Sequence, residues 1–474
     1  MTPVDADVPL LQRALSLCGL GVMVLLAWAL SYDRRRFPTR IVAWGVGLQL
    51  VFGFLVLRTS AGLWLFSRLN DGVGRLLAFT EEGSRFLFGD YLDEHFTVAF
   101  NVLPTIVFFS ALMSVLYHVG LMQKVVVGVA WAMQRTLKTS GAETLSAAAN
   151  IFVGQTEAPL VVKPFVGKMT ESELMAVMVG GFATVAGGVM AAYVGMLSAH
   201  FPDIAGHLIA ASVMSAPAAL VIAKVIRPET GTPETAGTLR LSDERPYANV
   251  IDAAAGGASD GMKLALNVAA MLLAFLALVA LVNWFFALPG TLHDEAVLDA
   301  LRGALEAADL AAPASCAAPE GHDAMLACAE GARTALRAAH VDPRPLGYLW
   351  EPLTLQRIVG WLGWPISFVM GVPAEDCATV SSLLGERVIL NEFVSYLRLS
   401  ENLAGPNPVS HRAAVITTYA LCGFANVGSI GIQLGGIGSL APERRADLAR
   451  LGVRAMLGGL LASYMTACVA GLLV

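Results

Sequence analysis

The chain has 474 residues, of which 56% are hydrophobic and 14% are charged, and its formal net charge is −6. A soluble domain usually carries about 25% charged residues to cover its surface, so an ordinary water-soluble enzyme is excluded. The acidic balance provides no basic patch for nucleic acid, and the six Cys contain no C-x-x-C pair that would indicate a zinc or redox motif. The sequence therefore predicts an all-α polytopic membrane protein.

Seven apolar runs are long enough to cross a bilayer core about 30 Å thick, which needs roughly 20 apolar residues per helix. They cover 10–31, 41–57, 97–118, 174–198, 204–226, 264–288 and 451–474. An eighth run, 413–437, is weaker because Gly interrupts it. We therefore expect about eight transmembrane helices, the first of them retained rather than cleaved as a signal peptide. The charged stretch 58–90 is expected to form an amphipathic helix at the outer surface.

Arginine clusters predict the orientation, because short cytoplasmic loops carry an excess of Lys and Arg. Four Arg follow the first span within 34–40, and counting spans forward puts Arg227 and the Arg group at 444–450 on the same side. This scheme places both termini outside. It also places outside the segment 290–345, whose composition is that of a soluble domain. In an oxidising periplasm Cys316 and Cys328 could close a small loop, but a free pair fits the sequence equally well.

Two stretches have apolar halves that are each too short to cross the bilayer. The first, 143–168, breaks at Gly-Gln-Thr-Glu-Ala-Pro (154–159), and the second, 374–399, breaks at Asn-Glu-Phe (391–393). Half-length helices meeting at such a break describe re-entrant hairpins. Irregular backbone at membrane depth is tolerated only where it is buried in protein or lines a cavity, so we expect both tips to face an aqueous site.

The spans that accompany these hairpins are interrupted as well, at 183–188 and at 423–433, where Gly, Thr, Asn and Ser free backbone carbonyls that can bind a hard cation. The same order of span, hairpin and spans thus occurs twice in opposite orientations, which is typical of the inverted repeats of secondary transporters. The predicted parts are 1–94 with the N-terminal spans, 95–226 as first repeat, 227–263 as cytoplasmic loop, and 264–474 as second repeat with an outer insertion at 290–345.

Glu157 and Glu392 lie at the two predicted tips. Insertion scales place a carboxylate at a helix centre at about +2.5–3.5 kcal/mol, so these residues need partners or a function. Either one could instead lie at a helix end at the level of water, or pair with Arg387 or Lys163. Gln155 and Asn426 could likewise act only as hydrogen-bonding links between helices.

Three strings carry a resemblance to the concentrative nucleoside transporter family: GQTEAPLVVKPF at 154–165, VILNEFVSY at 388–396 and GFANVGSIGIQLGG at 423–436. Together they are specific, and the resemblance covers about 95–474 apart from 290–345. It implies cation-driven uptake of nucleosides, purine or pyrimidine, by an elevator-like movement in a homotrimer, in which scaffold spans, 1–94 among them, surround moving transport domains. A bacterial inner membrane is the implied location.

The resemblance also implies the roles of individual residues. Around the nucleobase and the ribose it places eight substrate-binding residues: Gln155, Thr156, Glu157, Val189, Glu392, Phe424, Asn426 and Ser429. For a co-transported sodium ion it implies the side chains of Asn150 and Thr184 and the backbone carbonyls of Val153 and Val185. The Gln155-Thr156 pair and Asn150 favour sodium, whereas proton coupling through Glu157 or Glu392 is the rival.

Two further functions compete with a sodium/nucleoside symporter. The first is a proton-coupled transporter of nucleosides or free nucleobases, which would need no sodium. The second is a membrane-embedded transferase, which would want a metal-binding cluster or an activated nucleophile at the membrane surface. The sequence shows neither of those features, so we expect a transporter and not an enzyme.

Overall fold

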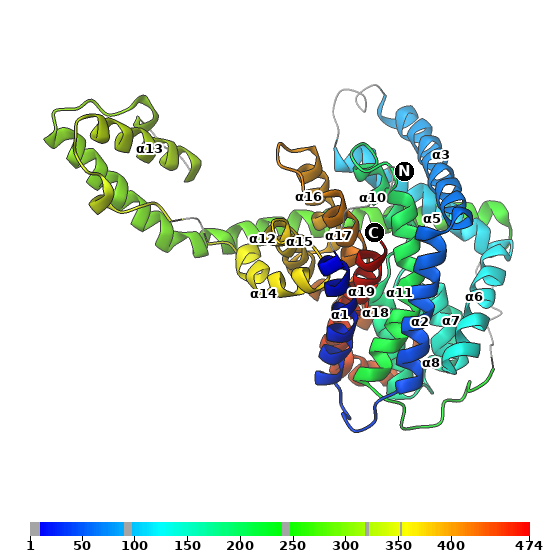
Figure 1. The fold of residues 1–474 in the computed structure, drawn as a ribbon. Helices are drawn as coiled ribbons and strands as arrows, with labels where there is room; N and C mark the ends of the chain where they lie inside the picture. The colour runs from blue at the N-terminus through cyan, green and yellow to red at the C-terminus, as the bar shows by residue number, and fades with distance from the viewer. Residues whose placement is uncertain (1–9, 90–96, 239–246, 318–321, 351–352) are drawn as a thin grey trace. The chain divides into compact units, whose positions relative to one another are not determined.

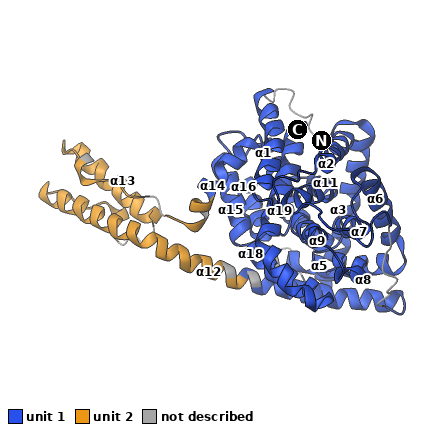
Figure 2. Ribbon diagram, turned by 90° about the horizontal axis from the view of Figure 1, so that it is seen from below, with its two compact units in different colours: residues 1–272, 360–474 blue, residues 273–359 orange. Residues whose placement is uncertain are grey.

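The computed structural model describes residues 10–89, 97–238, 247–317, 322–350 and 353–474, and every regular element within them is a helix. The chain divides into two compact units, shown in Figure 2. The first contains Met1–Leu272 and Gly360–Val474, and the second contains Leu273–Val359. The all-helical prediction is confirmed.

Seven helical segments of the described chain are long and apolar enough to span a bilayer. They are α1 (Leu10–Ala29), α2 (Thr39–Arg58), η1 (Val98–Val102) with α5 (Leu103–His118), α9 (Glu171–Ala183) with α10 (Gly187–Leu197), α11 (Ile204–Ile226), α12 (Val250–Ala307) and η5 (Pro442–Arg444) with α19 (Arg445–Leu473). The weak eighth run is divided into α17 (His411–Leu421) and α18 (Val427–Leu440). One expectation was wrong in length: the span predicted at 264–288 lies inside the 58-residue α12, which continues through Pro289 and Gly290. The Ala-, Leu- and Glu-rich residues beyond them favour helix again.

Three spans form the centre of the first unit. The buried share of the most apolar stretch is 89% in α11 and 83% in both α19 and α9–α10, whereas it is 28% in α1. A helix that is apolar all round belongs inside a bundle or in lipid, and here α19 packs against α1, α9, α11 and α17 (Figure 1). These central helices therefore supply the rigid frame on which the interrupted segments rest.

Small residues let α1 lie close beside α19. A Cβ atom at Gly19 would lie 2.7 Å from the Cys468 sulfur, and one at Gly471 would lie 2.7 Å from the Ser16 hydroxyl oxygen. The first turns of α1 therefore lie beside the last turns of α19, and the two helices run antiparallel. Such close contacts between small residues are the usual means by which membrane helices pack.

The basic segments of the chain gather at the opposite end of these helices. The Arg454 guanidinium lies 3.9 Å from the centre of the Tyr32 ring, and that of Arg227 lies 4.8 Å from it. Glu171, at the start of α9, accepts from Arg227 at 2.5 Å and from Arg450 at 2.7 Å. The arginines that the orientation argument places on one side of the membrane thus share one end of the fold.

Hairpin 1 consists of α7 (Gly141–Ala149), an irregular turn at 150–157, η2 (Ala158–Val162) and α8 (Lys163–Val166). Before it, α6 (Leu121–Leu137) is a surface helix with one buried face, formed at spacings of three and four by Met122, Val126, Ala130, Met133 and Leu137. All nine residues of α7 are buried. The structure therefore buries the first half of hairpin 1, whereas Glu157 of the predicted break is exposed and the second half is shorter than an ordinary half-helix.

Hairpin 2 consists of α15 (Cys377–Ile389) and α16 (Glu392–Ala404), and its break is at 390–391. The interrupted spans are also found, since α9 ends at Ala183 and α10 begins at Gly187. The second interruption is narrower than predicted. It covers only 422–426, because Asn426 caps α18 and the residues from Val427 onward are helical. The amphipathic stretch 58–90 forms α3 (Ser60–Phe88).

The second unit contains the far part of α12 and α13 (His322–Ala338). Leu298, Leu301 and Leu305 of α12 share a small core with Ala332 and Leu336 of α13. A disulfide joins Cys316 to Cys328, which decides between the two alternatives that the sequence left open. Most of the predicted 290–345 insertion lies in this unit.

Candidate functional site

The two interrupted spans meet at their breaks. The Phe424 N–H donates to the Thr184 carbonyl at 3.3 Å, so the unwound segment between α17 and α18 lies against the one between α9 and α10. Gly423 makes this possible: its φ is +143°, and a Cβ atom there would lie 2.6 Å from the Phe182 carbonyl oxygen. Only glycine adopts this conformation without strain and allows the backbones to approach so closely.

Glu392 of hairpin 2 is buried, with 4% of its surface exposed. It begins α16, which Asn391 caps by accepting from the Val394 N–H at 3.0 Å. Its Oε1 accepts from the Tyr193 hydroxyl of α10 at 3.0 Å, and its Oε2 accepts from the Asn426 amide at 3.2 Å. Both partners are neutral, so neither forms an ion pair with the carboxyl group, and its oxygens retain lone pairs for further donors.

Asn426 is fixed by its own position at the start of α18. Its Oδ1 accepts from the Ser429 N–H at 2.9 Å, as an N-cap residue does. The amide NH₂ is therefore turned toward Glu392. This contact links α18 to hairpin 2, so Asn426 does form the interhelical bond that the sequence left as an alternative, and Ser429 lies in the same first turn.

Arg387, one of the two residues weighed as a partner of Glu392, is used elsewhere. It is completely buried, and its guanidinium donates to the Ala420 carbonyl and, at 3.0 Å, to the Ser463 hydroxyl of α19. A cation at the last carbonyls of α17 is favourably placed relative to the helix dipole. Arg387 thus secures the end of α17 and is not hydrogen-bonded to Glu392.

At the tip of hairpin 1, Gln155 reaches the middle of α18. Its Oε1 accepts at 3.0 Å from Gln433, whose amide nitrogen also donates to the Met178 carbonyl of α9 at 3.1 Å. Thr156 packs next to Gly436, where an added Cβ atom would lie 2.6 Å from the Thr156 methyl. The tip is thereby held between α9 and α18.

The other predicted residues of the first tip lie nearby. The carboxylate of Glu157 folds over Gly154, where a Cβ atom would lie 2.3 Å from Oε2 and 3.4 Å from the Ala186 Cβ. In contrast to Glu392, the Glu157 side chain is exposed. Val189 is buried in the first turn of α10, just after the same break. The tip of hairpin 1 therefore lies against the interruption of the first repeat.

Helix α18 brings both hairpins to a common surface. Asn426, which holds Glu392, and Gln433, which holds Gln155, are separated by seven residues of sequence, or about 10 Å along a helix that rises 1.5 Å per residue. The two hairpin tips are thus held at points about two turns apart on α18. Gln433 and Tyr193 are not among the predicted site residues, although Gln433 lies within the string at 423–436.

Several oxygens around the first break are free to bind a cation. Asn150 is fully buried, its amide nitrogen donates to the Ser146 carbonyl at 3.1 Å, and its Oδ1 accepts no hydrogen bond. Within the described residues the carbonyls of Val153 and Val185 also accept none. The Thr184 hydroxyl donates to the Gly180 carbonyl at 2.8 Å, which leaves its lone pairs available.

These four residues lie in two neighbouring turns. The Gly187 N–H donates to the Phe152 carbonyl at 3.1 Å and so joins the turn of hairpin 1 to the break after α9. A Cβ atom at Gly180 would lie 3.2 Å from the Asn150 amide. An oxygen-only set of neutral amide, hydroxyl and carbonyl groups suits a hard cation. Gly180, which lies beside Asn150, directly precedes Gly181, which lies beside Gln155.

A buried ion pair holds the base of hairpin 1. Lys224 of α11 lies 2.7 Å from Glu143 of α7, and their side chains are 3% and 1% exposed. Lys224 also donates to Ser172 at 2.9 Å and to Glu229 at 3.3 Å. Removing one member of such a buried pair is strongly destabilising, so this contact anchors the hairpin to the central helix.

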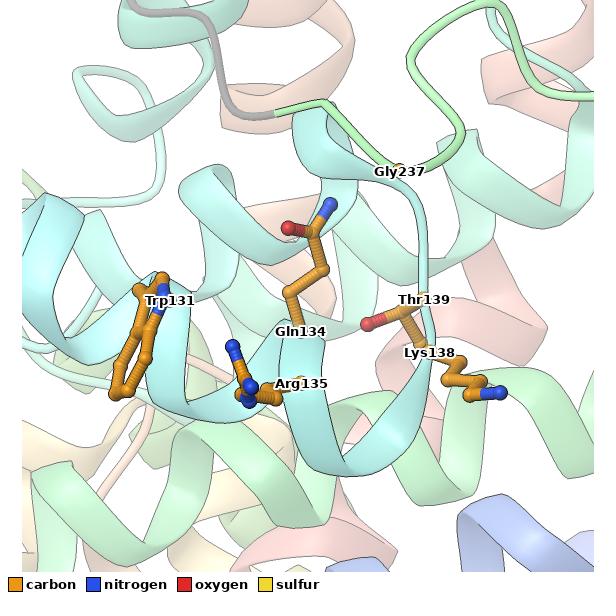
Figure 3. Close-up of a pocket in the computed structure, with 6 residues that line it drawn as sticks. All are labelled: Trp131, Gln134, Arg135, Lys138, Thr139 and Gly237. Atoms are coloured by element: carbon orange, nitrogen blue, oxygen red, sulfur yellow. The ribbon is translucent and has the colours of Figure 1, made fainter.

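A surface hollow of about 460 Å³ lies apart from these contacts, at the end of α6. Figure 3 shows its lining, which consists of Trp131, Gln134, Arg135, Lys138, Thr139 and Gly237. The Arg135 guanidinium lies 5.4 Å from the centre of the Trp131 ring. None of the predicted site residues lines this hollow.

Comparison with known protein families gives a clear result. The family model described as Na+ dependent nucleoside transporter C-terminus matches residues 207–311 and 321–471, and the corresponding N-terminus model matches 18–91. The chain belongs to this family. A third model, described as nucleoside recognition and named Gate, matches 99–200. The resemblance found in the sequence is thereby confirmed.

Individual relatives agree with this assignment. Sodium/nucleoside cotransporter 1 is 40% identical in Rattus norvegicus and 39% identical in Homo sapiens, each over 98% of this chain and 64% of the relative. The chain thus spans slightly less than two thirds of the length of these relatives. A solved structure of CNTnw in an inward-facing substrate-bound state is 38% identical over 98% of both chains with a TM-score of 0.77. A CNTnw variant in an outward-facing state has a TM-score of 0.80 at 37% identity, again over 98% of both chains.

Proposed function

We propose that the protein imports nucleosides together with sodium ions. The observation that carries the proposal is that α18 holds Glu392 of hairpin 2 at its start and Gln155 of hairpin 1 two turns later. The separation of about 10 Å matches a molecule with a hydroxyl-rich sugar at one end and a planar base at the other. The names of the relatives, sodium/nucleoside cotransporters, agree with this reading.

The chemistry of the two ends suits the two halves of a nucleoside. A nucleoside is uncharged, so its recognition needs acceptors, amides and hydroxyls rather than a cluster of Arg or Lys. Glu392 accepts from the ribose hydroxyls in charge-assisted bonds, which are about twice as strong as neutral ones, and Asn426 and Ser429 complete the sugar contacts. Phe424 lines the pocket.

The nucleobase lies at the tip of hairpin 1 in this proposal. Gln155, Thr156 and Glu157 contact its polar edge, directly or through water, and Val189 packs beside it. Arg387, a buried cation close to Glu392 in the sequence, is already engaged by Ala420 and Ser463. Nothing in this arrangement offers a counter-charge for phosphate, so nucleotides are not expected as substrates.

Sodium binds, in this proposal, at Asn150, Thr184 and the carbonyls of Val153 and Val185. The ion orders the turn of hairpin 1, and its charge offsets the two carboxylates, so ion and nucleoside each increase the affinity for the other. Inward movement of one positive charge under a negative membrane potential supplies about 2.3 kcal/mol per 100 mV.

Alternating access occurs, in this proposal, by an elevator-like movement within a homotrimer in the bacterial inner membrane, with both termini outside. Helix α1 packs against α19, and α2 packs against α11. These contacts favour a transport domain in which α1 and α2 move with the hairpins, rather than a scaffold that includes all of 1–94. Helix α5 is the better scaffold candidate. It lies between α10 and α12, where Gly188, Gly257 and Gly261 allow close contact with Ser110.

Uptake of labelled uridine and adenosine into proteoliposomes tests the proposal. We expect accumulation that depends on an inward sodium gradient and stops when choline replaces sodium at constant pH. Undiminished uptake in choline would refute sodium coupling and favour the proton-coupled alternative. No uptake of either nucleoside by correctly inserted protein would refute nucleoside transport itself.

A further inference from the structure

Gln433 is completely buried and lies where three interrupted elements meet. Its amide nitrogen donates both to the Met178 carbonyl of α9, at 3.1 Å, and to Gln155 of hairpin 1, at 3.0 Å. It thus connects the tip of one hairpin to the span that precedes the first break, through a residue of α18. No other described side chain is hydrogen-bonded to Gln155.

These two contacts fix the direction of both amides. A backbone carbonyl only accepts, so the atom of Gln433 that faces Met178 has to be its NH₂ group. That same NH₂ group faces Gln155, so Gln155 has to present its oxygen to it. An amide has one oxygen and one NH₂ group at its end, and the NH₂ group of Gln155 is therefore left for another acceptor.

We propose that Gln433 is a positioning residue that makes Gln155 a hydrogen-bond donor toward the nucleobase. This inference rests on the proposed function, because it assumes that a nucleobase lies at the tip of hairpin 1. Without Gln433, Gln155 is free to rotate its amide and presents donor and acceptor in turn. With Gln433 in place, the tip selects a ring that carries an acceptor at that point, such as a carbonyl oxygen or an unprotonated ring nitrogen.

A glycine of α9 lies directly beside these two amides. A Cβ atom at Gly181 would lie 2.7 Å from the Gln433 amide nitrogen and 2.8 Å from the Gln155 Cβ. A Cβ atom at the adjacent Gly180 would lie 3.2 Å from the Asn150 amide nitrogen. Two successive glycines of α9 thus leave space for the amides of Gln155 and Gln433 and for that of Asn150, the predicted ion ligand. Base recognition and ion binding would therefore both take place beside the same turn of α9.

Two variants test the proposal, and Gln49→Leu serves as a matched control. Gln433→Leu keeps the volume and removes the donor, and Gly181→Ala displaces it. Gln49 is another fully buried glutamine, in α2, and bonds only to Gly45 of its own helix. Competition against labelled uridine is measured with unlabelled uridine, with a riboside whose base is replaced by phenyl, and with 2′,3′-dideoxyuridine.

In the wild-type protein uridine should compete better than phenyl riboside. Gln433→Leu and Gly181→Ala should reduce that preference about fivefold, the factor expected for one neutral hydrogen bond, while the preference for uridine over 2′,3′-dideoxyuridine stays as in the wild type. A merely structural role would lower both preferences together. An unchanged base preference, or equal loss of both, would overturn the proposal.

Hydrogen exchange of the full-length protein provides a second measurement that needs no transport. Backbone amides at 154–158 should exchange faster in Gln433→Leu than in the wild type, and those of hairpin 2 should not change. Equal exchange at 154–158 would overturn the positioning role even if uridine is transported. Absence of both uridine and adenosine uptake by the wild type would instead refute the proposed function.

Discussion

Replacing Glu392 with Gln removes a charge but keeps the shape of the side chain. In the structure Oε1 accepts from Tyr193 and Oε2 accepts from Asn426. An amide has only one oxygen, and the Asn426 NH₂ group requires it, because the Asn426 oxygen is already occupied by the Ser429 N–H. The new NH₂ group therefore faces the Tyr193 hydroxyl, which can turn to accept. The variant should fold, because each protein contact can be satisfied again.

The substitution should weaken nucleoside binding rather than the fold. A hydrogen bond to a charged group contributes about 1.5–3 kcal/mol and a neutral one about 0.5–1.5, so each ribose hydroxyl loses about 1 kcal/mol. Two hydroxyls together lose about 2 kcal/mol, which corresponds to roughly 30-fold weaker nucleoside binding. Sodium-driven uptake should fall by at least that factor at low substrate concentration. Because the loss concerns the ribose hydroxyls, it should be much smaller for 2′,3′-dideoxyuridine.

The assay is uptake of labelled uridine into proteoliposomes, with competition by 2′,3′-dideoxyuridine. Glu401→Gln is the matched control, since Glu401 lies in the same helix but is exposed and pairs only with Arg398 at 2.8 Å. It should transport like the wild type. Wild-type transport by Glu392→Gln, or an equal loss for both ligands, would show that Glu392 does not bind the ribose.

Three further predictions concern the surroundings of the site. Tyr193→Phe should weaken uridine binding about tenfold by removing a donor to a carboxylate, and the effect should vanish in a Glu392→Gln background; a full effect there would show that Tyr193 acts independently. Thr184→Val should raise the sodium concentration for half-maximal uptake without lowering thermal stability, and an unchanged sodium dependence would remove its hydroxyl from the ion site. Lys224→Met should destabilise the purified protein by about 3–5 kcal/mol through unpaired Glu143, measured by thermal unfolding in detergent, and Lys224→Met with Glu143→Gln should recover part of the loss; no recovery would mean that the pair is not the cause.

The fold could be predicted from the sequence wherever hydropathy or a helix breaker decides the structure. The bounds of α11 were predicted without error, and the interruption after Ala183 was found from Gly and Thr within an apolar run. Prediction failed where a breaker does not end the helix. Pro289 and Gly290 directly follow the span predicted at 264–288 and are typical helix breakers, yet α12 continues through them to Ala307.

The site could be predicted only in part, because sequence shows which polar residues are improbable in a membrane but not what they contact. Glu392 was identified by its cost in lipid, yet its partner Tyr193 lies 199 residues away in another repeat. Tyrosine is common in membrane helices, so no local signal marks Tyr193. Arg387 illustrates the converse. It is close to Glu392 in the sequence, but its guanidinium donates to the Ala420 carbonyl at the end of α17.

The unwound segment between α9 and α10 lies against the one between α17 and α18. Each unwound segment lacks the internal hydrogen bonds of a helix, so its conformation depends on contacts from outside. Thr184 supplies one such contact to Phe424 through its carbonyl, and its hydroxyl oxygen remains available for a cation. An ion bound there would therefore bias the segment that leads directly to Asn426 and Glu392. Because coupling between two binding events is reciprocal, ribose contacts at Glu392 would strengthen ion binding by the same factor, without any direct contact between ion and nucleoside.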